Sequence, residues 1–148
     1  MILALLLQFT VFESYVQQAA ANMGVKGVSV QQGVINYGTA RNLAWVNNCT
    51  NFQQHGCGLN VVFIAHDTTR YAPPPVLMNL AYHEVCHIRL GHHLNYLRNA
   101  AADETAVGIC MIQVLGGIQY AKLEGARRSW EPIIIKLREA QFGPSPWR

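Results

Sequence analysis

Three consecutive prolines at residues 73–75 separate the clearest strand signal of the chain from its clearest helix signal. Before them, residues 59–66 ("LNVVFIAH") place β-branched and aromatic residues in line, which is typical of a buried strand. Proline lacks an amide hydrogen and is tolerated only near the start of a helix, so a helix can begin here but cannot run through. From residue 76 to about residue 92, apolar residues recur at helical spacing. The sequence therefore predicts a strand, an extended turn and a helix in that order.

The remaining segments give a coarse order of elements. We expect helices over residues 2–23, 99–116 and 119–142, two or three short strands within 25–46, and a loop over 47–58. Asn99 is expected to cap the second of these helices, and Pro132 to interrupt the third. This order predicts one α+β domain over residues 1–148, in which an N-terminal helix and a short mixed sheet precede a histidine-bearing helix and packed C-terminal helices.

Composition narrows the class of protein. The chain of 148 residues is 51% hydrophobic and only 13% charged, which favours a single compact domain over disorder. Its net charge of +3 comes largely from a C-terminal segment in which acidic residues alternate with basic ones, as on a solvated helix face. No nucleic-acid-binding signature is present, and we expect no nucleic-acid partner.

The apolar N-terminal segment has only twelve uncharged residues before Glu13, whereas a bilayer span needs about 20. We expect it to form a helix packed into the core. Association with a larger assembly or a membrane surface is the alternative role for this helix. The sequence predicts no particular cellular location.

The four cysteines form no CxxC pair. Cys86 and Cys110 lie in apolar helical contexts and are expected to be buried thiols. Cys49 and Cys57 flank a turn-rich segment and could close a loop in an oxidising compartment.

The most informative motif is "HEVCH", residues 83–87, within the predicted helix. Residues four apart face the same side of a helix, so His83 and His87 can both present imidazole nitrogens to one metal ion. Two imidazoles with room for an oxygen donor suit Zn²⁺. Glu84 lies beside the first histidine, where a carboxylate can accept a proton from water and pass it to a leaving amine.

A catalytic zinc ion needs a third protein ligand, and the sequence leaves three candidates open. Asp103 and Glu104 lie on the following helix, which can fold back antiparallel so that a carboxylate meets the two histidines. We favour Asp103 and expect Glu104 to face water. His93 has the spacing of the third histidine in HExxHxxGxxH, but that motif has glycine at position 90, where this chain has Leu90 and then Gly91.

HExxH on a helix, a following "LGH", and a second helix containing "AD" with an alanine three places later resemble the gluzincin metallopeptidases. The resemblance covers residues 59–117 by motif and the whole chain by order of elements. It implies a small zincin-like domain, with the strong strand lying at the cleft edge and pairing with an extended substrate. In several gluzincins the third ligand is a glutamate four residues before the "AD" aspartate, where this chain has Asn99.

The sequence and the resemblance together lead us to expect a zinc metallopeptidase acting on a peptide or protein. Zn²⁺ would be bound by His83, His87 and Asp103, with Glu84 as the general base. The alternative is a zincin-like structural or interaction protein whose metal site is degenerate, which the asparagine at position 99 favours. No GxSxG, GxGxxG or GxxxxGK[ST] motif supports another chemistry.

Overall fold

The computed structural model of the protein describes residues 2–35, 41–47, 59–94 and 99–143. Over this part of the chain the fold is α+β, as expected from the sequence. Its elements are α1 (Ile2–Met23), β1 (Ser29–Gly33), β2 (Ala44–Val46), β3 (Val61–Ala65), α2 (His66–Tyr71), α3 (Pro74–Arg89), a short 3-10 turn η1 (His92–Leu94), α4 (Ala100–Leu115) and α5 (Gly117–Phe142).

The described strands form one mixed sheet in the order β1-β3-β2. β1 and β3 are parallel, with Val30 opposite Val62, and β2 is antiparallel to β3, with Trp45 opposite Phe63. The strand with the strongest sequence signal, β3, therefore lies in the middle of the sheet and not at its edge. This corrects the expectation drawn from the resemblance, because a strand hydrogen-bonded on both sides cannot pair with a substrate.

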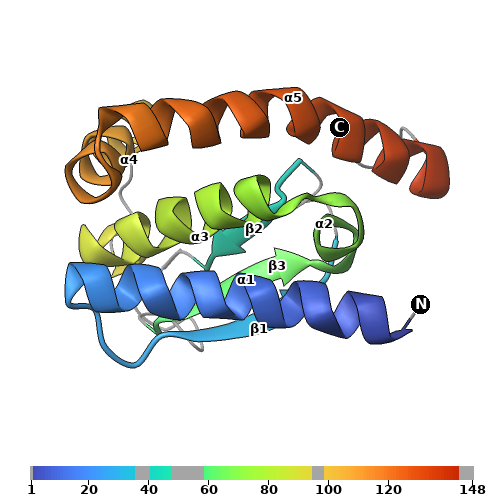
Figure 1. Ribbon diagram of the computed structural model, residues 1–148, viewed down its shortest axis with the longest axis horizontal. Coiled ribbons are helices and arrows are strands. Elements are labelled where there is room, and N and C mark those ends of the chain that lie inside the picture. The colour runs from blue at the N-terminus through green and yellow to red at the C-terminus, as the bar shows by residue number, and fades with distance from the viewer. Residues whose placement is uncertain (1, 36–40, 48–58, 95–98, 144–148) are drawn as a thin grey trace.

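The helix α3 lies at the centre of the molecule, between α1 and α5, with the strands behind it in the view of Figure 1. Nearly every residue from Val76 to Ile88 is buried, including the polar Asn79. The predicted N-terminal helix has the expected bounds, and from Phe12 onward it supplies core residues that pack against α3. No helix among the described residues is both long and apolar enough to cross a bilayer.

Two features of the helical part differ from the sequence prediction. The short helix α2 follows β3 directly and was not predicted, because its polar sequence "HDTTRY" has no apolar periodicity. The helix α5 continues through Pro132. Proline removes one backbone hydrogen bond, and here the buried residues Leu123, Ile134 and Ile135 anchor the helix on both sides of it.

A buried ion pair joins α5 to α2. Arg138 and Asp67 are 1% and 2% exposed, and the guanidinium donates to both carboxylate oxygens, from Nε at 2.7 Å and from Nη2 at 2.8 Å. Arg138 also donates to the backbone carbonyl of Asn42 at 2.9 Å, and Thr68 donates to that of Leu43 at 2.9 Å. These bonds fix the segment that leads into β2, and with it one wall of the site described below.

A disulfide between Cys86 and Cys110 joins α3 to α4. The expectation that both would be buried free thiols is therefore wrong, although both residues are buried as predicted. Apolar helical context indicates burial but does not show which two cysteines face each other. Cys49 and Cys57 lie outside the described residues.

Removing this disulfide is expected to destabilise the protein. A cross-link between residues 24 apart in sequence restricts the unfolded chain, and loops of this size correspond to about 3 kcal/mol. The double variant Cys86→Ala/Cys110→Ala should therefore lower the free energy of unfolding in urea by about that amount. A reductant should destabilise the wild-type protein similarly and leave the double variant unchanged. An equal response of both proteins to the reductant would contradict the assignment.

Candidate metal centre

Helix α3 positions the two histidines of the HExxH motif. It begins at Pro74, in the first turn where proline is tolerated, and its buried face continues to Ile88. His83 and His87 are one turn apart and largely buried, and their Nε2 atoms lie 3.2 Å from each other. The structure thus brings together the pair that the motif predicted.

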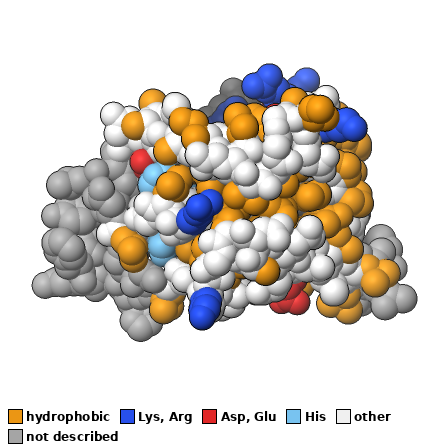
Figure 2. All heavy atoms as spheres, turned by 60° about the vertical axis from the view of Figure 1, so that its left-hand side comes forward, with side chains coloured by type: hydrophobic (Ala, Val, Ile, Leu, Met, Phe, Trp, Pro, Cys, Tyr) orange, Lys and Arg blue, Asp and Glu red, His pale blue; other side chains and the backbone are white. Residues whose placement is uncertain are grey.

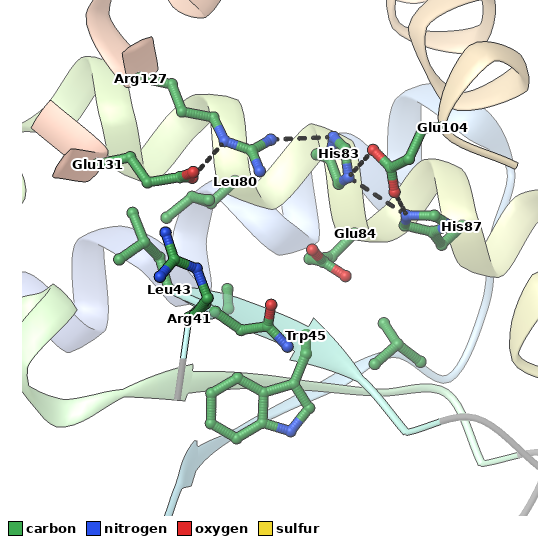
Figure 3. Close-up of a pocket in the computed structure, with 13 residues that line it drawn as sticks. Arg41, Leu43, Trp45, Leu80, His83, Glu84, His87, Glu104, Arg127 and Glu131 are labelled. Carbon is green, nitrogen blue, oxygen red and sulfur yellow. Dashed lines mark hydrogen bonds and ion pairs between the residues drawn. The ribbon is translucent and has the colours of Figure 1, made fainter. Parts of the chain in front are cut away.

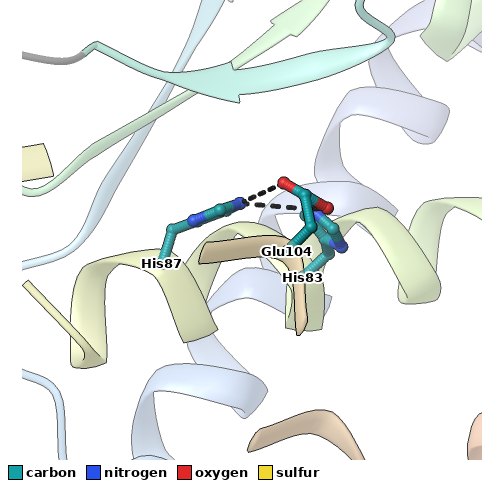
Figure 4. Close-up of side chains that lie close together, drawn as sticks. All are labelled: His83, His87 and Glu104. Atoms are coloured by element: carbon teal, nitrogen blue, oxygen red, sulfur yellow. Dashed lines mark hydrogen bonds and ion pairs between the residues drawn. The ribbon is translucent and has the colours of Figure 1, made fainter. Parts of the chain in front are cut away.

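Glu104 of α4 completes a cluster with these histidines (Figure 4). Its Oε2 lies 3.2 Å from Nε2 of His83, and its Oε1 lies 3.1 Å from Nε2 of His87. Helix α4 begins where the sequence predicted, because Asn99 accepts a hydrogen bond from the backbone N–H of Ala102 at 3.0 Å. Asn99 is therefore a helix cap in this chain.

Asp103, the favoured third ligand, does not join this cluster. Its Oδ1 lies 3.4 Å from Nε2 of His92. Successive residues point about 100° apart around a helix, so only one of Asp103 and Glu104 can face the α3 histidines. In the structure Glu104 faces these histidines. Its side chain is nevertheless 55% exposed, in agreement with the expectation that it faces water.

His93, the rival ligand, also lies elsewhere. It is 3% exposed, and its Nε2 donates to Oδ1 of Asn60 at 3.0 Å, while Asn60 donates to the carbonyl of Lys26. Nδ1 of His93 is buried and has no hydrogen-bond partner among the described residues. This histidine therefore links η1, which follows α3, to the residue just before β3.

Burial lowers the pKa of His93, assisted by the neighbouring His92 and His87. A histidine whose pKa is lower in the folded protein than in the unfolded chain reduces the stability of the fold as the pH falls below the unfolded pKa, about 6.5. The reason is that the unfolded chain then takes up the proton more readily than the folded protein. We expect His93→Gln, which keeps a donor toward Asn60, to lose less stability than the wild type between about pH 7 and pH 5. Urea unfolding of the metal-free proteins measures this difference. Parallel pH curves for the two proteins would refute it.

Each histidine of the cluster also has a partner on its other ring nitrogen. Nδ1 of His87 lies 2.9 Å from Nδ1 of His92. Nδ1 of His83 lies 3.2 Å from Nη1 of Arg127 on α5, as Figure 3 shows. The C-terminal segment that contains Arg127 has the charge pattern of a solvated helix face, yet this arginine contacts His83. No local pattern identifies Arg127, which is 44 residues from His83 in sequence.

Glu84 lies beside the cluster and faces a pocket (Figure 3). The pocket has a volume of about 340 Å³, and its walls come from α3, the segment entering β2, Glu104 of α4 and residues of α5. Desolvation raises the pKa of the buried Glu84 carboxyl, against the lowering effects of His83, His87 and Arg127. A carboxylate with a raised pKa takes up a proton more readily, which suits a general base.

Glu104 has the opposite electrostatic character. Its hydrogen-bonding contacts with His83 and then with His87 hold the pKa of its carboxyl far below the usual range. Burial opposes this shift but is the smaller effect. One carboxylate of the site is thus kept ionised, as a metal ligand must be, while the other is disposed to carry a proton.

The donor set fits a divalent ion. Nitrogen and oxygen ligands about 2.0–2.1 Å from a tetrahedral zinc ion lie about 3.3 Å from one another. The Nε2 atoms of His83 and His87 are 3.2 Å apart, and each lies within 3.2 Å of one oxygen of the Glu104 carboxylate, Oε2 for His83 and Oε1 for His87. These residues could therefore hold a metal ion without rearrangement of the two helices. Comparison of the chain with protein-family models, curated proteins and solved structures gives no match.

Proposed function

We propose that the protein is a zinc-dependent peptidase whose metal is bound by His83, His87 and Glu104. The observation that carries this proposal is the convergence of three donor groups, whose ligand atoms all lie within 4.8 Å of one another, next to a buried carboxylate, Glu84, in an open pocket. Imidazole and carboxylate ligands with an open position are typical of catalytic zinc sites. The order of helices and strands agrees with a zincin-like arrangement, which we include in the proposal.

In this mechanism Glu84 moves the proton. A zinc ion held by the cluster supplies a Lewis acid that acidifies water and polarises a carbonyl group. Glu84 takes the proton from the attacking water and transfers it to the nitrogen of the leaving amine, as its raised pKa favours. Burial keeps this carboxylate, which is 6% exposed, largely desolvated.

The substrate in this proposal is an extended peptide lying along β2. This strand is an edge of the described sheet, and residues 43–46 form one wall of the pocket. An edge strand can hydrogen-bond to the backbone of an added peptide strand, which gives affinity for many sequences. The pocket beside β2 then receives the peptide bond next to Glu84.

Metal binding tests the ligand set directly. We expect the wild-type protein to bind one zinc ion, and Glu104→Ala to weaken binding more than Asp103→Ala, because only Glu104 contacts both histidines. Elemental analysis and calorimetric titration of the stripped proteins measure this, with the exposed Glu13→Ala as control. Loss of a direct ligand should cost more than the 10–100-fold typical of outer partners. Stronger loss in Asp103→Ala would restore the ligand set predicted from the sequence.

A second candidate is an interaction protein in which a metal only ties α3 to α4. Hydrophobic side chains gather over the face shown in Figure 2, between a few cationic ones. Among the exposed large hydrophobic residues are Leu90 at the end of α3 and Ile109 and Ile112 on α4. A peptide-library assay separates the two candidates: zinc-dependent cleavage that a chelator stops supports the peptidase, and zinc binding without cleavage supports the interaction protein.

A further inference from the structure

Five side chains form a continuous row of contacts through the metal cluster. From Arg127 on α5 the row passes through His83 and His87 on α3 and His92 of η1 to Asp103 on α4. Nη1 of Arg127 lies 3.2 Å from Nδ1 of His83, and the Nε2 atoms of His83 and His87 are 3.2 Å apart. The Nδ1 atoms of His87 and His92 are 2.9 Å apart. Nε2 of His92 lies 3.4 Å from Oδ1 of Asp103.

The two ends of the row fix the direction of its hydrogen bonds. A guanidinium has only donors, so Nδ1 of His83 must be the acceptor and carries no proton. A carboxylate accepts, so Nε2 of His92 carries a proton toward Asp103. An uncharged imidazole has one N–H, so the proton of His83 is on Nε2 and Nδ1 of His92 is bare.

The middle of the row agrees with these assignments. The bare Nδ1 of His92 can only accept, so Nδ1 of His87 carries a proton toward it. Nε2 of His83 and Nε2 of His87 both face the carboxylate of Glu104, which accepts, at 3.2 and 3.1 Å. Arg127 therefore sets the proton position on His83, and His92 with Asp103 sets the proton at Nδ1 of His87.

The two ligand histidines are therefore prepared in opposite ways. His87 already carries a proton on Nδ1, toward His92, as it would when its Nε2 binds a metal. His83 has a proton on the nitrogen that would bind the metal. Ligation would move that proton to Nδ1, where it would point at the donors of Arg127.

We propose that Arg127 competes with the metal for His83, whereas His92 and Asp103 are positioning residues that present His87 to the metal. This inference rests on the metal centre proposed above and concerns the control of its loading. Zinc binding requires Arg127 to leave His83. The arginine remains attached through Nε to Glu131 at 3.0 Å, so its guanidinium stays at the wall of the pocket.

The test measures zinc affinity in variants that should change it in opposite directions. Arg127→Met removes the competing donor and should tighten binding about tenfold or more, as for a hydrogen bond to a charged group. The exposed neighbour Arg128→Met is the matched control for lost charge and should leave affinity unchanged. Arg127→Gln, whose amide oxygen can accept from Nδ1–H, should bind at least as tightly as Arg127→Met. Titrations at about pH 8 keep an ordinary imidazole uncharged.

The same titrations test the positioning residues. His92→Leu should weaken zinc binding about 10–100-fold, the usual effect of losing a partner of a ligand histidine. His92→Asn should recover part of that loss, because its side-chain oxygen offers an acceptor near the place of Nδ1. Nitrogen-15 spectra of the metal-free protein should show His83 protonated at Nε2 and His87 protonated at Nδ1.

Two outcomes would overturn the inference. Weaker or unchanged zinc binding in both Arg127 variants would show that Arg127 does not compete, and identical tautomers for His83 and His87 would show that their partners do not set the proton positions. Either result leaves the proposed peptidase intact if the wild type binds zinc and cleaves peptides. Conversely, the tautomer spectra and zinc titrations can support the inference even if no peptide is cleaved.

Discussion

Glu84→Gln is expected to lower peptide hydrolysis about 10²–10⁴-fold while the protein still binds zinc. Glutamine has nearly the shape of glutamate but cannot take up the proton that Glu84 transfers. The variant keeps His83, His87 and Glu104, whose atoms form the metal cluster. Turnover of a peptide substrate and zinc stoichiometry, measured on the same preparation, test this result.

The control for this variant is Glu13→Gln, which changes an exposed glutamate of α1 that does not line the pocket. We expect that variant to keep most of the turnover. Unchanged turnover in Glu84→Gln would refute the general-base role. Loss of zinc in Glu84→Gln would instead show that this glutamate belongs to the ligand set.

Arg138→Met is expected to destabilise the protein by about 3–5 kcal/mol. Without the guanidinium, Asp67 remains as an unpaired buried carboxylate, and the carbonyl of Asn42 loses its donor. Lys136→Met, at an exposed position of the same helix, should have little effect. Urea unfolding of the metal-free proteins measures both changes without a contribution from bound zinc.

The double variant Arg138→Met/Asp67→Leu separates the loss of the ion pair from the loss of packing. Replacing both members of a buried pair by apolar residues removes the unpaired charge, so this protein should recover much of the lost stability. If the loss of stability in the double variant equalled the sum of the losses in Arg138→Met and Asp67→Leu, the two residues would contribute to stability independently of each other.

The sequence predicted local structure well. The bounds of α1, the cap at Asn99 and the shared face of His83 and His87 all follow from spacing within a short segment. The α+β class followed from the order of those segments. These features depend on interactions between near neighbours in the chain, which a single sequence displays directly.

Long-range placement could not be predicted from the same information. Asp103 and Glu104 are adjacent, so the choice between them depends on the rotation of α4 about its axis, which its packing against α3 decides. Arg127 meets His83 across 44 residues, and Arg138 meets Asp67 across 71. Both arginines have the alternating charge pattern of a solvated face, and only the packing of α5 shows that they point inward.

The proline within α5 has a mechanical consequence. Pro132 cannot donate to the carbonyl of Arg128, so the helix is most easily bent between Arg127, which contacts His83, and Arg138, which is bonded to α2 and to the approach to β2. Because Leu123 and Ile134 hold the helix to the core on both sides of the proline, a bend here is confined to the turns near Arg127. Withdrawal of Arg127 from His83 then needs only a small local change and leaves both ends of α5 undisturbed.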